Sequence, residues 1–287
     1  MIARKYSSLM AMAIGLLSIT LSSCSNESDE TDTGSKFVRI TEYPQASGEV
    51  ENFHADLVYN SLGNVTGYNE ASSPGTPVFN LNFTYDGTGT KPVKATYDVS
   101  QHFFKYDAAG RLAQDSVIVY DPTPTVPTSY TEIRNITYPS PTLMILNTVT
   151  MGTPGINNQI IDSLAVDSRG NVTQSKLYTK NAAGDFYLAV LQNWQYDDKP
   201  NPFGSLNIFP VLQPGFTDIY FGIRNRSFLQ KNNCTAYSLL TYKDGALIYT
   251  ESYSFTLSYN SNGTVREAIA VKTAGAGFSY RYVYDYD

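Results

Sequence analysis

Two histidines are the side chains best suited to acid–base or metal chemistry in this chain. Histidine is the commonest general base and metal ligand near neutral pH, and the sequence has only His54 and His102. His54 and Asp56 share one face if their segment is a strand, which would place two metal ligands together. A polar edge position is the simpler interpretation. His102 precedes Phe103 and Phe104, which favours packing against aromatic rings. We therefore expect no metal site.

Carboxylates are the other candidates for catalysis. Glycoside hydrolysis requires two carboxylates that face each other across a cleft, but the sequence alone does not pair them. The Gly-x-Ser-x-Gly turn of serine hydrolases does not occur, and Gly275-Ala276-Gly277 lacks the third glycine of a dinucleotide loop. We expect a non-enzymatic protein without a cofactor. The available glutamates are Glu42, Glu70, Glu132, Glu251 and Glu267.

Three aromatic residues, Trp194, Tyr196 and Phe203, are the candidate ligand-binding residues. Exposed aromatic rings stack on sugar rings and on peptide side chains, and these three lie at the start of a long irregular stretch. The alternative is that they attach this stretch to the sheet. Exposure of the rings distinguishes the two interpretations, because stacking requires an open face.

The N-terminus carries an export signal. Arg4 and Lys5 precede an apolar run over residues 9–21, and Leu21-Ser22-Ser23 precedes Cys24. This tetrad resembles the bacterial lipobox, in which the signal is cut before the cysteine and the thiol takes a diacylglycerol. The resemblance implies lipidation of Cys24 and attachment to the outer membrane through the lipid.

The residues after Cys24 are acidic and polar. The segment 25–32 resembles the export tag that sends Bacteroidetes lipoproteins to face the extracellular medium; the alternative is retention on the periplasmic face. We divide the chain into a signal peptide (1–23), a lipidated acidic tether (24–35) and a single all-β domain (36–287).

The net charge and the number of cysteines restrict the classes of binding partner and the disulfides that the chain can form. Removal of residues 1–23 takes away Arg4 and Lys5 and makes the net charge −8, which argues against nucleic acid as a partner. With Cys24 acylated, Cys234 has no disulfide partner, and we interpret it as a small buried residue.

The fold class follows from aromatic content and from a repeated turn. The chain has 23 Tyr and 14 Phe, and its apolar residues alternate with period two; Tyr280, Tyr282, Tyr284 and Tyr286 share one face. A strand-ending residue, then Asp or Asn, then Gly predicts a hairpin with glycine at positive φ. Copies begin at residues 59, 85, 106, 166, 242 and 259, with a degenerate copy at 196.

These hairpins predict an antiparallel meander of about fourteen to sixteen strands, curled into a barrel or half barrel. Residues 121–128 form a proline-rich loop that cannot join a ladder. Residues 196–233 are the largest interruption: 199–204 are expected to be loop, and the stretch after them has room for a short helix or two.

Two resemblances extend this interpretation. The Tyr-Asp-x-x-Gly-Arg turn resembles the YD repeats of secreted toxins and teneurins, which stack hairpins into β shells. Trp194-Gln195-Tyr196-Asp197-Asp198-Lys199-Pro200-Asn201-Pro202-Phe203 with Phe228-Leu229-Gln230-Lys231-Asn232-Asn233 resembles an uncharacterised family of Bacteroidetes surface lipoproteins, a domain of unknown function with a porin-like β fold. This resemblance implies a large curled meander and no assigned activity.

A lipid-immersed pore is not expected, because strands such as 91–97 carry polar residues on both faces. We predict a surface lipoprotein that binds a glycan, a peptide or a partner protein. The alternatives are a structural component of a cell-surface assembly, which open sheet edges would favour, and a glycan-active enzyme.

Overall fold

The structure, a computed structural model, describes residues 36–44, 50–72, 75–97, 100–120, 129–152, 159–206, 230–275 and 279–287. Residues 36–287 form one compact unit. Within the described ranges the chain forms sixteen strands and one short 3-10 helix, η1 (Pro202–Ser205). The strands are β1 (Phe37–Pro44), β2 (Phe53–Tyr59), β3 (Val65–Ser72), β4 (Thr76–Tyr85), β5 (Pro92–Tyr97), β6 (Ser100–Tyr106), β7 (Leu112–Tyr120), β8 (Ser129–Ser140), β9 (Leu143–Met151), β10 (Gln159–Val166), β11 (Val172–Lys180), β12 (Phe186–Pro200), β13 (Asn232–Lys243), β14 (Ala246–Tyr259), β15 (Val265–Ala274) and β16 (Tyr280–Tyr286).

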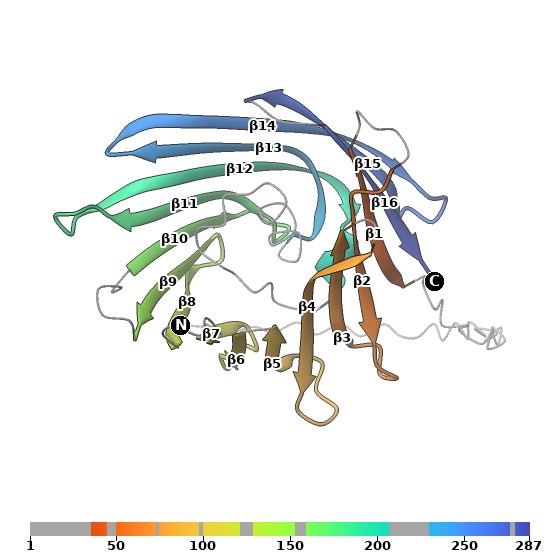
Figure 1. The fold of residues 1–287 in the computed structure, drawn as a ribbon, viewed down its shortest axis with the longest axis horizontal. Coiled ribbons are helices and arrows are strands. Elements are labelled where there is room, and N and C mark those ends of the chain that lie inside the picture. The colour runs from red at the N-terminus through yellow and green to blue at the C-terminus, as the bar shows by residue number, and fades with distance from the viewer. Residues whose placement is uncertain are drawn as a thin grey trace, which may run out of the picture. The chain divides into compact units, whose positions relative to one another are not determined.

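The strands form one antiparallel meander that closes into a barrel (Figure 1). Each strand pairs with the next one in sequence, and β16 pairs with β1, which sets Phe37 opposite Tyr286 and Pro44 opposite Tyr280. The predicted all-β meander is therefore confirmed. Of the barrel and the half barrel, the closed barrel is the form adopted, and the described strands leave no unpaired edge.

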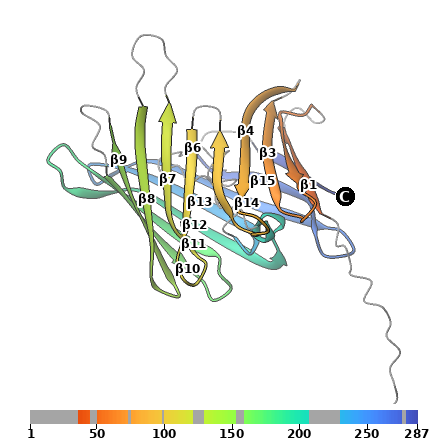
Figure 2. The same cartoon turned by 90° about the horizontal axis from the view of Figure 1, so that it is seen from below.

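The interior of the barrel is filled with side chains. Figure 2 shows β3, β4, β6, β7 and β8 in front of β11–β14, with the two groups of strands running across each other. Their facing sides share one core, to which β2 contributes Phe53, Ala55 and Leu57 while His54 and Asp56 point outward. We call the face with the buried side chains the inner wall and the opposite face the outer wall.

The repeated turns have the geometry that the sequence predicts. In the first turn, the Asn60 side-chain oxygen accepts hydrogen bonds from the backbone N–H groups of Leu62 and Asn64, each at 3.0 Å. The glycine that follows has positive φ in every full copy, including Gly110 at 74° and Gly263 at 83°. The prediction of positive φ at these two glycines is confirmed. Asx side chains and left-handed glycines therefore set where the strands reverse.

The repeated turns, apart from the shortened copy at 242–245 between β13 and β14, lie at one end of the barrel, which defines its two ends. The turn end is where β1 begins and where the turns at 60–64, 86–91, 107–111, 167–171 and 260–264 lie. The loop end is where β1 finishes. Residues 121–128, predicted to form a proline-rich loop, lie outside the described residues.

Six tyrosines close the turn end. Each hydroxyl donates to the carbonyl oxygen of the first residue of the preceding strand, over 2.5–3.0 Å. Each bond joins two neighbouring strands that no turn connects at this end. Turns and tyrosine hydrogen bonds therefore alternate around most of the turn end. We call them the closing tyrosines. They are Tyr59 (to Phe37), Tyr85 (to Val65), Tyr106 (to Pro92), Tyr138 (to Leu112), Tyr196 (to Val172) and Tyr286 (to Val265).

The stretch after Tyr196 differs from the prediction at two points. Residues 196–198 do not turn, because β12 continues to Pro200 and pairs there with Asn232. The side chains of Asn232 and Asn233 both donate to the carbonyl oxygen of Lys199, at 3.1 and 3.3 Å, and so hold extended backbone where a loop was expected. The helix η1 begins inside the segment 199–204 that was expected to be loop, and the short helix predicted for the stretch after that segment falls almost entirely on residues outside the described ones. Residues 207–229 lie outside the described residues.

Candidate functional site

The three aromatic candidates pack against the barrel. Trp194 lies on the inner wall of β12, with 5% of its surface exposed and its ring 5.6 Å from that of Tyr237. Phe203 in η1 is 4% exposed and meets the ring of Phe37 edge-on at 4.8 Å. Tyr196 is one of the closing tyrosines. Two of the three rings offer no open face, which favours attachment over stacking. Ligand binding by these residues stays a prediction.

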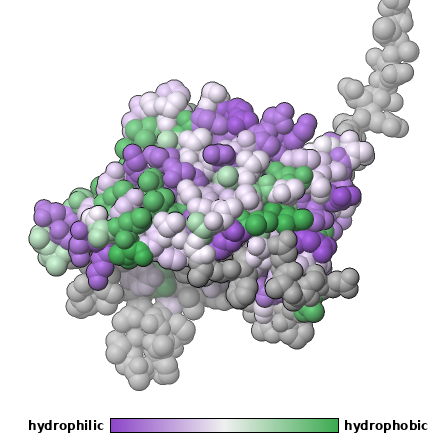
Figure 3. Space-filling view, turned by 90° about the horizontal axis from the view of Figure 1, so that it is seen from above, coloured by the Kyte–Doolittle hydropathy of each residue, from purple (hydrophilic) through white to green (hydrophobic). Residues whose placement is uncertain are grey.

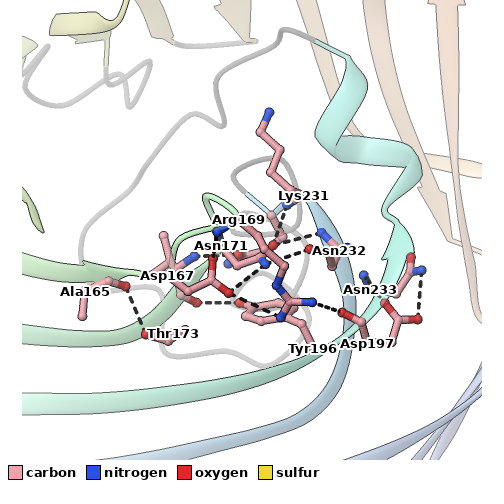
Figure 4. Close-up of polar contacts among 12 residues, drawn as sticks. Ala165, Asp167, Arg169, Asn171, Thr173, Tyr196, Asp197, Lys231, Asn232 and Asn233 are labelled. Atoms are coloured by element: carbon pink, nitrogen blue, oxygen red, sulfur yellow. Dashed lines mark hydrogen bonds and ion pairs between the residues drawn. The ribbon is translucent and has the colours of Figure 1, made fainter. Parts of the chain in front are cut away.

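The polar residues of the same stretch fasten its two ends to the turn end of the barrel (Figure 4). Asn171, fully buried in a β10–β11 turn, accepts hydrogen bonds from the backbone N–H groups of Lys231 and Asn232 at 2.8 and 2.9 Å. Its own amide donates to the Asn232 side chain at 2.9 Å. Gln230 accepts from the N–H of Val172 at 2.9 Å. We call this group, with Asp197 and Asn233, the insertion clamp.

Asp197 is the second centre of the insertion clamp. Its carboxylate accepts from the backbone N–H groups of Asn233 and Lys199, at 3.1 and 3.0 Å, and from the hydroxyl of Tyr259. Burial and this carboxylate together raise the pKa of Tyr259 above its ordinary value. Arg169 donates to the Asp197 carbonyl oxygen at 2.6 Å. Protein donors therefore satisfy this carboxylate, and its bonds hold the two ends of the insertion together.

The helix η1 fits against the clamp through a cap and a glycine. The Asn201 side chain accepts from the N–H of Phe203 at 3.1 Å and donates to the Gln230 carbonyl at 3.3 Å. A Cβ added at Gly204 would lie 2.2 Å from that same carbonyl oxygen, so only glycine fits there. The sequence Asn201-Pro202-Phe203-Gly204 thus encodes a docked turn that places Phe203 on the core.

A second cluster, on the inner wall, contains titratable side chains of the kinds used in acid–base chemistry. The His102 Nδ1 lies 3.1 Å from the Asp115 carboxylate, and Arg134 Nη1 donates to the same carboxylate at 3.1 Å. Arg134 Nη2 donates to Glu132 at 2.7 Å. We call these four residues, on β6, β7 and β8, the His102 cluster. His102, Asp115 and Arg134 are each at most 2% exposed, and the His102 ring stacks near Phe104, as the sequence predicted.

The other glutamates each contact a neighbouring side chain. Glu251 pairs with Lys272 and accepts from the Tyr253 hydroxyl at 2.8 Å, which together with burial raises the pKa of Tyr253. Glu42, Glu70 and Glu251 all point into the core, whereas Glu267 lies outside, 3.6 Å from Arg281. The structure therefore distributes the candidate carboxylates around the barrel.

The remaining sequence candidates have structural partners. Asp56 is held by two hydrogen bonds from Arg39, and His54 Nδ1 lies 2.5 Å from Glu51. In the described part of the chain, no group of three or more His, Cys, Asp or Glu residues is arranged to hold a metal ion. Burial raises the pKa of the Cys234 thiol to about 12, so this thiol stays protonated and unreactive at neutral pH.

The outer wall carries polar side chains on several strands. Amide side chains form cross-strand hydrogen bonds there: Gln114 donates to Asn135 at 2.9 Å, and Gln174 donates to Asn193 at 2.9 Å. On the face that carries β13 and β14, polar and apolar side chains are interspersed (Figure 3). A barrel in a bilayer carries a continuous apolar band about 25 Å tall on its outside. In this barrel the buried apolar side chains face inward, and the outer wall mixes polar and apolar residues.

Exposed apolar side chains gather at the loop end instead. Most of the large apolar residues that are exposed in the described ranges lie at or near strand termini at this end. Phe186 and Leu247 are 41% and 53% exposed. The full set at the loop end is Val50, Tyr120, Met151, Phe186, Leu247, Ile248 and Tyr249. We call it the loop-end rim.

Comparisons with known proteins show the fold. No protein-family model matches the sequence, and no curated protein matches it. A porin-like protein from Bacteroides vulgatus has a TM-score of 0.55 and 11% identity, over 88% of this chain and 99% of its own. A porin-like protein from Bacteroides uniformis has a TM-score of 0.52 and 11% identity, over 89% of this chain and 98% of its own.

These likenesses agree with the porin-like fold that the sequence resemblance implied. At 11% identity these two structures show a similar fold and do not show a similar function. Among the described residues, no helix has the length and apolar character needed to cross a membrane.

Proposed function

We propose that the chain is a lipid-anchored barrel on the outer membrane, facing the extracellular medium, and that it binds a glycan, a peptide or a surface protein without catalysing a reaction. The polar side chains of the outer wall support an anchor, since a wall with hydrogen-bonded amides such as Gln114 and Asn135 would be costly in lipid. Acylated Cys24, which lies outside the described residues, would then hold the barrel at the membrane.

The loop-end rim is the observation that carries the binding role. The closing tyrosines and the insertion clamp occupy the turn end, where Lys36 leads into β1. The tether is therefore attached at the turn end, and the loop-end rim lies at the opposite end. Leu247, Ile248 and Tyr249 are consecutive exposed residues at the start of β14, and grouped exposed apolar side chains are characteristic of interaction sites.

The alternatives have less support. Open sheet edges would have favoured a role as a structural component of a cell-surface assembly. Because β1 pairs with β16, no described strand is an edge strand of the sheet. A glycoside hydrolase would need a pair of carboxylates across a cleft; Glu132 and Glu251 instead each contact a basic side chain.

The anchor is tested by replacing the acylated residue. In Cys24→Ser we expect loss of acyl labelling and of membrane retention, with the melting temperature of the purified protein unchanged, because Cys24 lies outside the compact unit of residues 36–287. Unchanged acyl labelling in this variant would contradict the lipoprotein assignment.

The binding role is tested at the loop-end rim with a matched control. Leu247→Ser and Phe186→Ala should reduce retention on immobilised surface polysaccharides, host glycans or cell-surface proteins. Leu62→Ser changes a leucine that is 61% exposed, against 53% for Leu247, but lies in a turn at the opposite end. It should bind like the wild type. Equal loss in all three variants, or retention that none of them alters, would refute the rim as the contact surface.

A further inference from the structure

Strand β14 extends beyond its neighbour β15 at the loop end. The pairing of β14 with β15 begins at Ser252, which lies opposite Ala274, whereas its pairing with β13 continues to Ala246. Figure 1 shows the β13–β14 hairpin running past the tip of β15. Closure of the barrel leaves no edge strand, but among the described residues the segment 246–250 has a neighbouring strand on one side only. We call residues 246–250 the β14 overhang.

The β14 overhang is exposed and uncharged. Its five residues, Ala-Leu-Ile-Tyr-Thr, are all exposed although they belong to a strand. Since successive side chains of a strand point to opposite faces, neither face of this segment is covered. Natural proteins protect exposed strand edges with charged side chains or proline, and the overhang has neither. An uncharged segment of this kind, open on one side, is suited to pairing with another strand.

Ile248 is set apart from its neighbours by the register of the hairpin. Thr241 lies opposite Tyr249 and Tyr242 lies opposite Leu247, so no residue of β13 lies opposite Ile248. The side chain of Ile248 is 59% exposed. An extra residue of this kind increases the local twist of a strand, so a short added strand fits here better than a long one. A short strand on the open side of β14 would cover Ile248.

The tip of the hairpin argues against insertion into a lipid membrane. Asp244 and Gly245 form a tight turn, with φ of 52° and 81°, and Lys243 precedes them. A membrane would be entered by this tip first, and the charges of Lys243 and Asp244 would then have to leave water. The apolar side chains lie behind the tip, along the side of the hairpin. A strand from another protein chain can reach them there.

We propose that the strand that covers the β14 overhang is the same segment of a second copy of this chain. Two identical strands pair antiparallel about a two-fold axis, and each copy then makes the same contacts as the other. With the axis near Ile248, Leu247 of each copy lies close to Tyr249 of the other, an aliphatic–aromatic cross-strand pair. No like charges face each other, because the segment has none. Each two-stranded hairpin, which is marginally stable alone, gains a third strand.

The dimer is expected to be weak and reversible. The exposed parts of Leu247, Ile248 and Tyr249 amount to roughly 300 Å² per copy, against about 800 Å² per partner in a stable complex. A contact of this size forms at high protein concentration and dissociates on dilution. This inference goes beyond the proposed function, because self-association requires no ligand.

Sedimentation velocity of the full-length protein tests the contact. The fraction of dimer should rise with protein concentration in the wild type, and Ile248→Lys, which places a charge at the axis, should stay monomeric. Leu62→Lys is the matched control: Leu62 is 61% exposed and lies in a turn at the opposite end, so this variant should dimerise like the wild type. Both variants should keep the wild-type melting temperature, because both side chains are exposed. A wild type that is monomeric at its highest soluble concentration, or a dimer that Ile248→Lys does not weaken, would overturn the proposal.

Cysteine crosslinking tests the two-fold arrangement. In the full-length Cys24→Ser protein, Ile248→Cys should form an intermolecular disulfide on oxidation, because the axis brings the two copies of this residue together. Cys234 does not compete, since burial raises the pKa of its thiol to about 12. Leu62→Cys is the control, and equal crosslinking in the two variants would refute the arrangement. Phe186→Ala separates this inference from the proposed function, because it should reduce ligand retention and leave dimerisation unchanged.

Discussion

The hydroxyl of Tyr85, the last residue of β4, donates to the carbonyl oxygen of Val65, the first residue of β3, at 2.6 Å. Strands β3 and β4 are joined only at the loop end by the chain itself, so this bond connects them at the turn end. The same relation recurs in all six closing tyrosines. The carbonyl of a strand's first residue at a sheet end would otherwise need water, and the tyrosine satisfies it while its ring covers the core.

The first prediction concerns that bond. Tyr85→Phe keeps the ring and removes the hydroxyl, so we expect the free energy of unfolding to fall by about 1 kcal/mol. Tyr120→Phe, a half-exposed tyrosine at the loop end, is the control and should change it by less than about 0.5 kcal/mol. Urea denaturation measures both. Equal midpoints for the two variants would mean that the bond to Val65 contributes nothing.

The second prediction is a loss of stability at alkaline pH. Burial raises the pKa of Tyr59, Tyr85 and Tyr286 to about 12 each, above the value of 10.0 for a free tyrosine. The unfolded chain therefore loses these protons at lower pH than the folded protein does. Their contribution to stability is complete below about pH 10 and is lost as pH rises through about 12.

Urea denaturation between these pH values measures the effect. The triple variant Tyr59→Phe, Tyr85→Phe and Tyr286→Phe should lose stability less steeply with pH than the wild type. Identical slopes would show that these hydroxyls do not govern the alkaline limit.

Much of the fold could be predicted because turn chemistry is local. Asn60 and Gly63 specify a turn through one side-chain acceptor and one positive φ, and both are visible within five residues of sequence. Closure could not be predicted in this way. It depends on the register between Phe37 and Tyr286, which are at opposite ends of the chain. The tyrosine in each turn motif was interpreted as a strand former, and its hydrogen bond to the neighbouring strand has no sequence signal.

The candidate site was harder to predict for the same reason. Asn171 and Asn232 are 61 positions apart and meet only because the insertion returns to the barrel. His102 and Asp115 face each other because β6 and β7 are paired in one particular register. A sequence signal existed for part of this, since Ser100, His102 and Phe104 alternate along one strand. What could not be inferred was which acidic residue lies opposite.

The third prediction tests backbone strain at a turn. Gly263 has φ of 83°, and a Cβ added to it would meet no atom within 4 Å, so a substitution there isolates the conformational cost. Gly263→Val should destabilise the protein by about 1–2 kcal/mol. Gly263→Asn should cost less, because asparagine tolerates this conformation. Thermal denaturation of both variants checks the order, and a valine variant as stable as the asparagine variant would contradict it.

The last prediction addresses the only tryptophan. Trp194 is 5% exposed, with its ring against Tyr237 on the next strand. Trp194→Ala should lower the free energy of unfolding by about 3–5 kcal/mol through the cavity that it leaves. Leu191→Ala, on the outer wall of the same strand, should cost clearly less, because that side chain is only partly buried.

Denaturation and retention on glycans, measured on the same two variants, separate the interpretations of Trp194. A large loss of stability, with ligand retention lost only in proportion to unfolding, is the result expected of a core residue that attaches the insertion. Preserved stability with abolished retention would mean instead that the ring meets the ligand. In that case the binding surface would extend inward from the loop-end rim, past Gln192, to the tryptophan.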